Sequence, residues 1–331
     1  MLSEKEIHKA LFNISSDAEF NALALAVFLY QYNNTEVYGK FVKSLKIKAN
    51  AIKHYSEIPF IPIEFFKTQQ ISSKPLSADT VQFTSSGTTG QITSTHYVSD
   101  INLYEKSFIK GFELFYGKPN NYCILALLPN YLERGGSSLV YMFDRLIKES
   151  AHPLSGFYLH TTDALIKTLA HLKHASQKTL LLGVTYALLD LADHDIVVGE
   201  HVTVMETGGM KGRRKEMIKE EVHAVLKEKL STHAIHSEYG MTELLSQAYA
   251  KRDGLFECPP WMRVLIRDTN DPFSYVKPGK GGGINVIDLA NLYSCSFIET
   301  KDLGKMHADG SFEILGRFDN SDLRGCNLMI G

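Results

Sequence analysis

The N-terminal part of the chain carries apolar residues at helical spacing. Between residues 17 and 46 they recur every three or four positions on either side of a polar Asn-Asn-Thr break: Phe20, Leu23, Val27, Tyr30, Val37, Phe41 and Leu45. This spacing predicts core-facing helices. In the following stretch, Pro59 and Pro62 exclude a helix interior and favour extended backbone, so we expect a connector that crosses an apolar surface.

A second helical pattern begins near Ser99 and stops at Gly117 and Pro119. Its apolar residues fall on one stripe: Ile101, Tyr104, Phe108, Phe112 and Phe115. Serine before such a stripe is a common N-cap, because its hydroxyl accepts a hydrogen bond from the first backbone N–H groups. We therefore expect a helix, capped by Ser99, with one face on the core.

Several later segments are apolar on both faces, which is typical of strands in a sheet that is covered on both sides. They are YCILALLP at 122–129, TLLLGVT at 179–185 and HVTVMETGG at 201–209, and a helical pattern follows from about Arg213 to Leu230. Strands that alternate with helices indicate α/β layering.

The C-terminal sequence changes to short strand-like runs separated by glycines, at 278–290, 296–304 and 310–319. This predicts a mainly β part. We expect one domain over residues 1–331, with a mainly helical part at 1–78, a layered α/β part at 79–270, and a β subdomain with a C-terminal tail at 271–331.

Composition narrows the class of protein. With 44% hydrophobic residues, 22% charged residues and a formal net charge of −2, the chain is typical of globular proteins and carries no bulk charge that would attract nucleic acid. The four cysteines are far apart, which favours free thiols in a reducing compartment over a zinc cage or a disulfide framework. The longest apolar run, residues 22–30, is too short to span a membrane, so we expect a cytoplasmic protein without a membrane span.

The stretch VQFTSSGTTGQITSTHYV at 81–98 is unusually rich in hydroxyls and glycine. Glycines let backbone N–H groups approach an anion, and hydroxyls add donors, so this loop could wrap a polyphosphate. It is not a Walker loop, because Gly87 and Gly90 are too close together and no Lys follows; the flanking β-branched residues predict a loop between two strands. A polar hairpin turn without a ligand is the alternative.

The loop resembles the phosphate-binding signature of the adenylate-forming superfamily, which includes acyl-CoA ligases, peptide-synthetase adenylation domains and beetle luciferases. Four further stretches resemble signatures of that superfamily in the same order: ETGGM at 206–210, EYGMTE at 238–243, TKDLG at 300–304 and GRFDNSDLRG at 316–325. Within the superfamily, IPFIPIEFFK, ERGGSSLVYMFDRLI and ETGGMKGRRKE resemble the acyl-protein synthetases, also called long-chain-fatty-acid luciferin-component ligases.

The resemblance implies an adenylate-forming large-domain fold that binds ATP and Mg²⁺. The β and γ phosphates would be held by Thr84, Ser85, Ser86, Gly87, Thr88, Thr89 and Gly90. Adenine would be flanked by Gly208, Gly209 and Tyr239, and the same signature adds Gly240, Met241, Thr242 at the α-phosphate and Glu243 at Mg²⁺. Asp302 would bind the ribose with help from Arg317, although Lys301 stands where glycine is usual. Alternatively, Tyr-Gly-x-Thr-Glu could be a turn followed by a helix capped by Thr242.

Most members of the superfamily continue into a mobile lid with a catalytic lysine, and this chain stops at Gly331, so we expect no lid. In acyl-protein synthetases a cysteine near the C-terminus carries the acyl group, which implies that role for Cys326. A small hydrophobic role for Cys326 is the alternative. Cys123, Cys258 and Cys295 are expected in the core.

Two other motifs stay open at this point. His236, with His233 nearby, could act as the base for the thiol or line the acyl pocket, or it could be purely structural. The segment ERGGSS at 133–138 could face a carbonyl group, or it could be a helix N-terminus capped by Ser137 or Ser138.

The function that these motifs imply is ATP-dependent activation of a carboxylic acid, with a fatty acid as the expected substrate, to an acyl-adenylate. The acyl group would then pass to Cys326 and on to an acyl-accepting protein such as a reductase or a carrier protein. The alternatives are an acyltransferase that takes its acyl group from acyl-CoA or acyl carrier protein without ATP, and a nucleotide-binding module without turnover.

Overall fold

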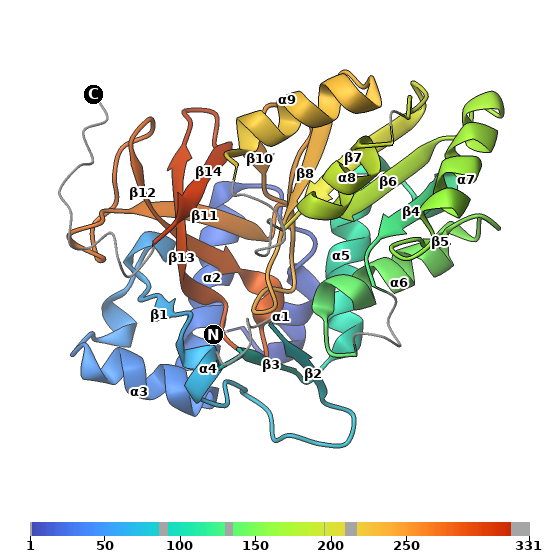
Figure 1. Ribbon diagram of the computed structural model, residues 1–331. Helices are drawn as coiled ribbons and strands as arrows, with labels where there is room; N and C mark the ends of the chain where they lie inside the picture. Colours follow the sequence, from blue (N-terminus) through green and yellow to red (C-terminus); the bar gives the residue numbers. More distant parts are fainter. Residues whose placement is uncertain (1, 86–91, 130–134, 195, 209–216, 319–331) are drawn as a thin grey trace.

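The computed structural model describes residues 2–85, 92–129, 135–194, 196–208 and 217–318 (Figure 1). The helices in these ranges are α1 (Glu4–Ala10), α2 (Asp17–Asn34), α3 (Glu36–Ser44), α4 (Phe65–Thr68), α5 (Ile101–Tyr116), α6 (Ser138–Ser150), α7 (Thr162–His174), α8 (Thr185–Ala192) and α9 (Lys219–Leu230). None of them combines the length and the apolar character that crossing a lipid bilayer requires.

The strands in the described ranges are β1 (Ile61–Pro62), β2 (Val81–Thr84), β3 (Thr95–Val98), β4 (Cys123–Leu127), β5 (Gly156–Phe157), β6 (Thr179–Val184), β7 (Val202–Thr207), β8 (Ile235–Tyr239), β9 (Ala248–Ala250), β10 (Phe256–Glu257), β11 (Met262–Arg267), β12 (Gly281–Asp288), β13 (Phe297–Met306) and β14 (Phe312–Arg317). Most of them join one long sheet in the order β11-β12-β13-β14-β10-β9-β8-β7-β6-β4-β5, while β2 and β3 form a separate hairpin.

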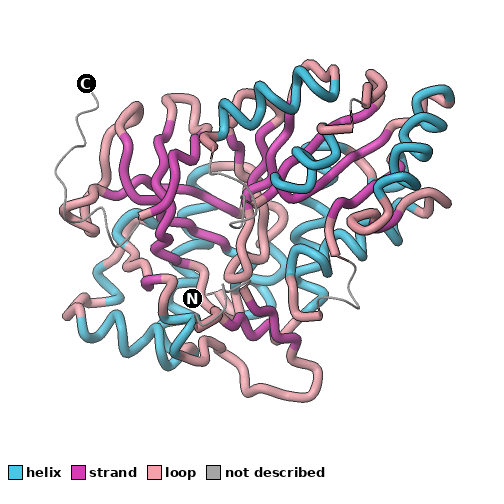
Figure 2. Tube along the Cα trace, viewed as in Figure 1, coloured by secondary structure: helices cyan, strands magenta, loops and turns pink. Residues whose placement is uncertain are grey.

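The long sheet, whose strands are magenta in Figure 2, has a parallel half and an antiparallel half according to the pairing of its strands. Strands β5, β4, β6, β7 and β8 pair in parallel, and from β8 to β9 onwards every pair along the sheet order is antiparallel. In the parallel half, α5 and α6 cover one face, and α8 and α9 cover the other (Figure 1). Because the strands there are covered on both faces, β4 and β6 consist of buried residues throughout.

The antiparallel half is packed against the N-terminal helices. Phe28 of α2 and Tyr38 of α3 contact the ring of Phe297 in β13 at centroid distances of 6.2 and 6.1 Å. The side-chain amide of Gln31 donates to the backbone oxygens of Asn291 (2.9 Å) and Leu292 (3.0 Å), so a polar group buried under α2 has its partners. These contacts join segments about 260 residues apart.

The mixed α/β fold predicted from the sequence is confirmed. The apolar runs form β4, β6 and β7, the C-terminal runs form β12 to β14, and the hydroxyl-rich stretch is flanked by the paired strands β2 and β3. The connector with Pro59 and Pro62 contains only the two-residue strand β1, which pairs with β13, and the single turn α4.

Two predicted helix starts are wrong. Asp100, not Ser99, caps α5, because its carboxylate accepts hydrogen bonds from the N–H groups of Asn102 (3.0 Å) and Leu103 (3.3 Å). The helix predicted from about Arg213 begins at Lys219, and the described residues 217–218 precede it. A helix after Thr242 is also wrong, because residues 240–247 lead without a helix into β9.

Candidate active site

The candidate site lies where the parallel half of the sheet meets the antiparallel half. The carboxyl ends of β6, β7 and β8 meet at one edge and are followed by Thr185, Gly208 and Gly240. Open α/β sheets bind ligands at this edge, outside the carboxyl ends of their strands. Gly208 has a φ of +74°, a conformation that favours glycine, and its carbonyl oxygen lies 3.1 Å from the hydroxyl of Thr185.

Three residues predicted to bind adenosine come together at this edge. The Tyr239 hydroxyl donates to Asp302 Oδ2 (2.8 Å), and Arg317 Nε lies 3.2 Å from Asp302 Oδ1. Asp302 and Arg317 are direct cross-strand partners in β13 and β14. Burial raises the pKa of Asp302, and the charge of Arg317 and the hydrogen bond from Tyr239 oppose that rise.

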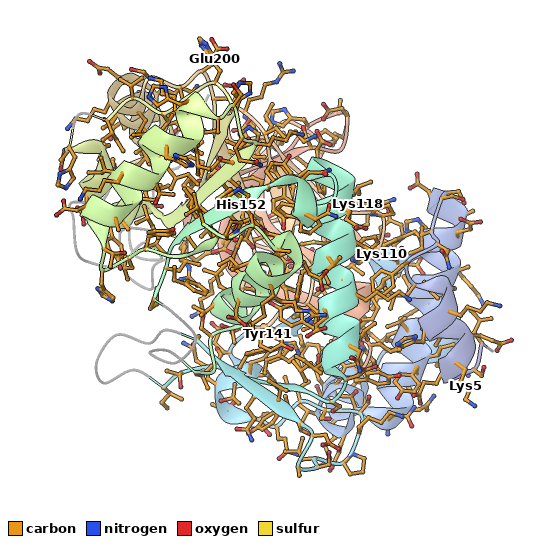
Figure 3. All side chains as sticks on the ribbon, turned by 90° about the vertical axis from the view of Figure 1, so that its right-hand side faces the viewer. Lys5, Lys110, Lys118, Tyr141, His152 and Glu200 are labelled. Carbon is orange, nitrogen blue, oxygen red and sulfur yellow. The ribbon has the colours of Figure 1, made fainter. Side chains whose placement is uncertain are left out.

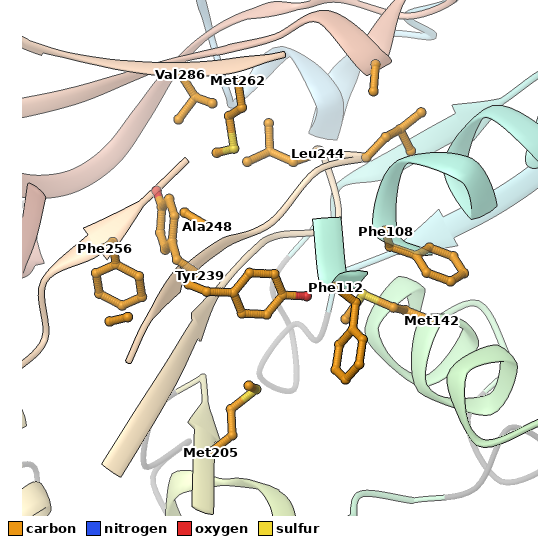
Figure 4. Packing of buried hydrophobic residues seen from close by; sticks show 14 of the residues in the cluster. Phe108, Phe112, Met142, Met205, Tyr239, Leu244, Ala248, Phe256, Met262 and Val286 are labelled. Carbon is orange, nitrogen blue, oxygen red and sulfur yellow. The ribbon is translucent and has the colours of Figure 1, made fainter. Parts of the chain in front are cut away.

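Lys301, the departure from the usual glycine, has a partner of its own. Its ammonium pairs with Glu64, in the connector before α4, and therefore points away from the neighbouring carboxylate of Asp302 along the strand. The Tyr239 ring packs on the ring of Phe256 at a centroid distance of 6.0 Å (Figure 4). It also packs on the ring of Phe312 at 5.9 Å. The substitution thus leaves the Tyr239–Asp302–Arg317 cluster in place.

The β2–β3 hairpin brings the described ends of the hydroxyl-rich loop to the same edge. Ser85 and Ser94 close the base of the loop, with Ser85 N donating to Ser94 O (3.0 Å) and Ser94 N donating to Ser85 Oγ (2.9 Å). Thr84 N donates to Gly136 O (2.7 Å), next to the start of α6. Ser137 caps α6 by accepting from Val140 N (3.4 Å), which confirms the capping interpretation of that segment.

His96 fixes the hairpin to the segment that carries Thr242 and Glu243. Its Nδ1 lies 2.9 Å from the Thr242 carbonyl oxygen, and its Nε2 lies 2.8 Å from Ser294 Oγ. Burial lowers the pKa of His96 to about 4, so the ring is neutral at pH 7. A neutral imidazole donates from one nitrogen only, and the Thr242 carbonyl accepts, so Nδ1 carries the proton.

Glu243 is buried beside the hairpin, with 5% of its surface exposed. Burial raises the pKa of its carboxyl group, and a hydrogen bond from Ser94 and the positive charge of Arg317 act in the opposite direction. Arg317 therefore lies within electrostatic range of both Asp302 and Glu243, which joins the two groups of residues into one site. A single carboxylate that shares a site with phosphate oxygens is the donor set that Mg²⁺ prefers.

Two buried side chains, Asp288 and Asn291, hold the turn after Glu243. Asp288 accepts from the backbone N–H groups of Leu245 (2.9 Å) and Ser246 (2.8 Å) and from the Ser246 hydroxyl (2.6 Å). Asn291 Nδ2 donates to the Glu243 carbonyl oxygen (2.7 Å). These four hydrogen bonds to buried partners hold the backbone on the C-terminal side of Glu243 in position.

Sequence reasoning missed two buried carboxylates at this edge. Glu206, in β7, receives a hydrogen bond from Lys219 Nζ (2.6 Å) and lies 3.6 Å from His223 Nε2 on the α9 face of the sheet. Burial alone would raise its pKa, but Lys219 and the surrounding hydrogen bonds lower it to about 2. Glu238, in β8, accepts a short hydrogen bond from Thr207. For Glu206, an acidic residue inside the mostly apolar run of β7 was the available signal, whereas β8 also contains His236 and Ser237 and gives no such signal.

Glu238 faces the opposite side of the sheet, toward α5. Burial, followed by repulsion from Glu206, raises its pKa to about 7, although the Thr207 hydroxyl opposes that rise. His236 is on the same face, with Nδ1 3.2 Å from the Tyr116 hydroxyl, and burial and Lys251 lower its pKa to about 4. His236 is therefore neutral at pH 7. The described residues contain no group of three or more His, Cys, Asp or Glu side chains placed to hold a metal.

Part of the predicted site lies outside the described residues: Ser86, Gly87, Thr88, Thr89, Gly90, Gly209 and Cys326. Of the remaining cysteines, Cys123 and Cys295 are fully buried as predicted, and Cys258 is partly buried against the core. Gly240 and Met241 connect β8 to the Thr242 turn, and their proposed part in nucleotide binding stays a prediction.

Comparison with known proteins identifies similar folds rather than relatives by sequence. No model of a known protein family matches the sequence, and no curated protein matches it. Among solved structures, 2-hydroxyisobutyryl-CoA ligase in complex with 2-HIB-AMP and CoA is similar over 93% of this chain and 72% of that chain, with 12% identity and a TM-score of 0.69.

Two further structures are similar over shorter stretches. ATP-bound MatB from Rhodopseudomonas palustris matches 73% of this chain and 49% of its own, with 19% identity and a TM-score of 0.53. O-succinylbenzoate coenzyme A synthetase (MenE) from Bacillus subtilis, in complex with AMP, matches 75% and 51%, with 17% identity and a TM-score of 0.52. The match thus spans about half the length of MatB and MenE, and the chain has the fold of the adenylate-forming enzymes.

Proposed function

We propose that the protein activates a carboxylic acid with ATP to form an acyl-adenylate. The observation that carries this proposal is the meeting of Tyr239, Asp302 and Arg317 with Glu243 and the base of the hydroxyl-rich loop at the carboxyl edge of the sheet. Solved structures with this fold contain ATP, AMP or 2-HIB-AMP, which supports the binding of a nucleotide at the candidate site.

Each residue has a role that its chemistry allows. The Gly208 turn and the Tyr239 ring would flank adenine, and Asp302, whose two oxygens keep free lone pairs beside Tyr239 and Arg317, would accept hydrogen bonds from the ribose hydroxyls. The hydroxyl-rich loop would donate to the β and γ phosphates, and Thr242 would reach the α-phosphate. Glu243 would hold Mg²⁺, which supplies positive charge against the phosphate oxygens when bound.

The first half-reaction follows from these positions. A carboxylate oxygen of the acid attacks the α-phosphorus, the bond to the β-phosphate oxygen breaks, and pyrophosphate leaves with its electron pair. The donors around the phosphates offset the charge that develops on them.

The second half-reaction transfers the acyl group to sulfur. We propose that the thiolate of Cys326 attacks the acyl carbonyl, that AMP leaves, and that the resulting thioester passes its acyl group to a partner protein such as a reductase or a carrier protein. Neutral His236 is the proposed acceptor of the thiol proton. The resemblance to acyl-protein synthetases supports this route and a fatty acid as the substrate class.

The test of the first step is isotope exchange between pyrophosphate and ATP with a panel of carboxylic acids. We expect acid-dependent exchange in the wild type, and for Asp302→Ala a loss of nucleotide affinity of about 10-fold to 100-fold, because one or two hydrogen bonds to a charged group are removed. Asp309→Ala is the matched control, because Asp309 lies at the tip of the same β13–β14 hairpin and only caps the turn at Ser311 (2.7 Å).

The second step is tested by trapping labelled acyl-protein. Cys326→Ala is expected to retain exchange and lose the acylated form. Acylation from acyl-CoA without ATP would instead identify an acyltransferase, and nucleotide binding in calorimetry without exchange for any acid would identify a binding module. Either result contradicts the proposal.

A further inference from the structure

A group of polar side chains is buried on the α5-facing side of the sheet, beside the candidate site. Glu238 and Tyr249 are cross-strand partners in β8 and β9, so their side chains lie side by side on this face. Gln247 is close to them, because its Cγ and the Glu238 carboxylate both border the space where Gly240 has no side chain. We refer to Glu238, Gln247 and Tyr249 as the polar triad.

Two atoms of the polar triad have no hydrogen-bond partner among the described residues. They are Gln247 Oε1 and the Tyr249 hydroxyl, and their residues are 5% and 1% exposed. A buried polar group left without a partner costs about 1–3 kcal/mol of stability. Native proteins contain few such groups, and one at a ligand site is explained when the ligand supplies the missing partner.

The walls around the polar triad are aromatic. The Tyr249 ring contacts Phe115 (5.2 Å) and Tyr116 (5.4 Å) of α5, and Phe108 and Phe112 of the same helix are fully buried (Figure 4). Figure 3 shows α5 and α6 side by side, where Tyr141 of α6 donates to Glu105 of α5 (2.7 Å). The α5 side of the triad is therefore closed by aromatic rings, and α6 packs beside α5.

The polar triad lies close to the proposed reaction centre. Glu238 directly precedes Tyr239 and lies four residues before Thr242 in the chain. Tyr104, at the start of α5, is close enough for its pKa to be raised by the Glu238 charge, and its hydroxyl donates to Ser138 O (3.0 Å) beside Gly136 and Thr84. An acid with its carboxylate at Thr242, including the fatty acid proposed above, would have the substituents on the carbons next to its carboxylate beside the polar triad.

We propose, on the basis of the adenylation activity proposed above, that the acid carries a hydrogen-bond-donating substituent, a hydroxyl or an amine, which binds to Glu238, Gln247 and Tyr249. A donor is required because Gln247 Oε1 has no partner in the described part of the chain and can only accept, whereas the Tyr249 hydroxyl and the Glu238 carboxyl, which can carry a proton, adapt to either role. An unsubstituted hydrocarbon chain at this point leaves these atoms unpaired. Sites built to bind a hydroxyl or amine reject analogues without one by large factors.

The experiment compares matched acids in the exchange assay: straight-chain acids against their 2- and 3-hydroxy and 2- and 3-amino counterparts. The same acids are tested, with AMP present, for their effect on the melting temperature, which reports binding without turnover. We expect a substituted acid to exceed its unsubstituted counterpart by about 10-fold or more in kcat/KM. The hydroxy and amino series show which donor is the natural one.

Gln247→Leu and Tyr249→Phe test the triad directly. Both variants are expected to reduce the preference for the substituted acid by about 10-fold, and Tyr249→Phe is expected to fold with unchanged or higher stability, because it removes an unpaired hydroxyl. Tyr122→Phe is the matched control: its hydroxyl is paired with Tyr116 O (2.9 Å) elsewhere in the same aromatic layer, so the preference stays unchanged.

Equal use of plain and substituted acids by the wild type overturns the inference and leaves the proposed adenylation intact. A marked loss of stability in Tyr249→Phe, without a change in acid preference, also overturns it, because the hydroxyl then has a permanent internal role. If no acid supports exchange, the proposed function fails, and the melting shifts still decide the inference: it fails if plain and substituted acids shift the melting temperature equally.

Discussion

Each face of the sheet contains a buried glutamate, and the surroundings of the two glutamates shift their pKa values in opposite directions. On the α9 face, Glu206 is matched by Lys219 at 2.6 Å and its pKa is low. On the α5 face, one strand away, Glu238 accepts from Thr207 and lies near two atoms unpaired within the described residues, Gln247 Oε1 and the Tyr249 hydroxyl, and burial raises its pKa to about 7. A buried carboxylate with a dedicated cation stabilises the fold, whereas one beside unsatisfied polar atoms is available to a ligand.

The largest effect is expected from removing the cation on the α9 face. Lys219→Ala leaves the buried Glu206 without its lysine, with hydrogen bonds from neutral groups such as the Thr185 hydroxyl, and the free energy of unfolding should fall by about 3–5 kcal/mol, measured by urea denaturation. In the control Lys227→Ala, on the same helix, the lost partner is an exposed Asp253 at 3.9 Å, and the change should stay within about 0.5 kcal/mol. Equal losses in the two variants would show that Glu206 is not an anchored ion pair.

On the α5 face, Gly240→Ala is expected to destabilise by about 1–3 kcal/mol, because the new methyl group collides with the Glu238 carboxylate, which is buried and held by Thr207. It should also abolish the proposed acid preference, since the polar triad is displaced. Gly156→Ala is the control: its methyl group meets only a Tyr158 ring carbon at 3.8 Å. A Gly240→Ala variant with wild-type stability would contradict the described position of Glu238.

The smallest expected effect is the pH dependence of stability, which differs between Glu238 and Glu206. Burial raises the pKa of Glu238 from 4.5 to about 7, so the folded protein holds a proton that the unfolded chain releases, and stability falls as the pH rises between about 4.5 and 7. The pKa of Glu206 is lowered to about 2, mainly by Lys219 against the effect of burial, so its stabilisation is present above 4.5 and is lost as the pH falls toward 2.

The measurement is the melting temperature of the wild type, Glu238→Gln and Glu206→Gln across both pH ranges. Glu238→Gln should flatten the profile between pH 5 and 7 by a few degrees. His236 does not interfere there, since burial places its pKa at about 4. An unchanged slope in Glu238→Gln would mean that Glu238 titrates normally in the folded protein.

Much of the fold could be predicted from the sequence, because strands covered on both sides leave uninterrupted apolar runs such as the one in β4. The contact between Tyr239, Asp302 and Arg317 could be predicted only through resemblance to a known superfamily, since Tyr239 and Arg317 are 78 residues apart in the chain. No local sequence pattern specifies the β13–β14 register that pairs Asp302 with Arg317. The capping residue of α5 was missed because Ser99 and Asp100 are both good caps, and only the backbone geometry decides between them.

The polar triad could not be predicted for a different reason. β8 is buried on both faces, so alternation along the strand carries no hydrophobic signal that tells which side Glu238 occupies. The unpaired state of Gln247 and Tyr249 depends on the distance to every neighbour, which no local sequence pattern contains. Cys326 and most of the hydroxyl-rich loop stay predictions.

The pairing of Gln31 with residues 291–296, and of Ile61 in β1 with Ile298 in β13, has a consequence for biosynthesis. The N-terminal helices leave the ribosome long before β13 and the segment 291–296 are translated. Their apolar faces therefore stay exposed to solvent until those residues have been synthesised. Such long-range closure slows folding and exposes nascent chains to aggregation. Ribosome-arrested chains that end before β13 are therefore expected to bind chaperones and to be digested readily by protease, whereas chains extended past β14 are not.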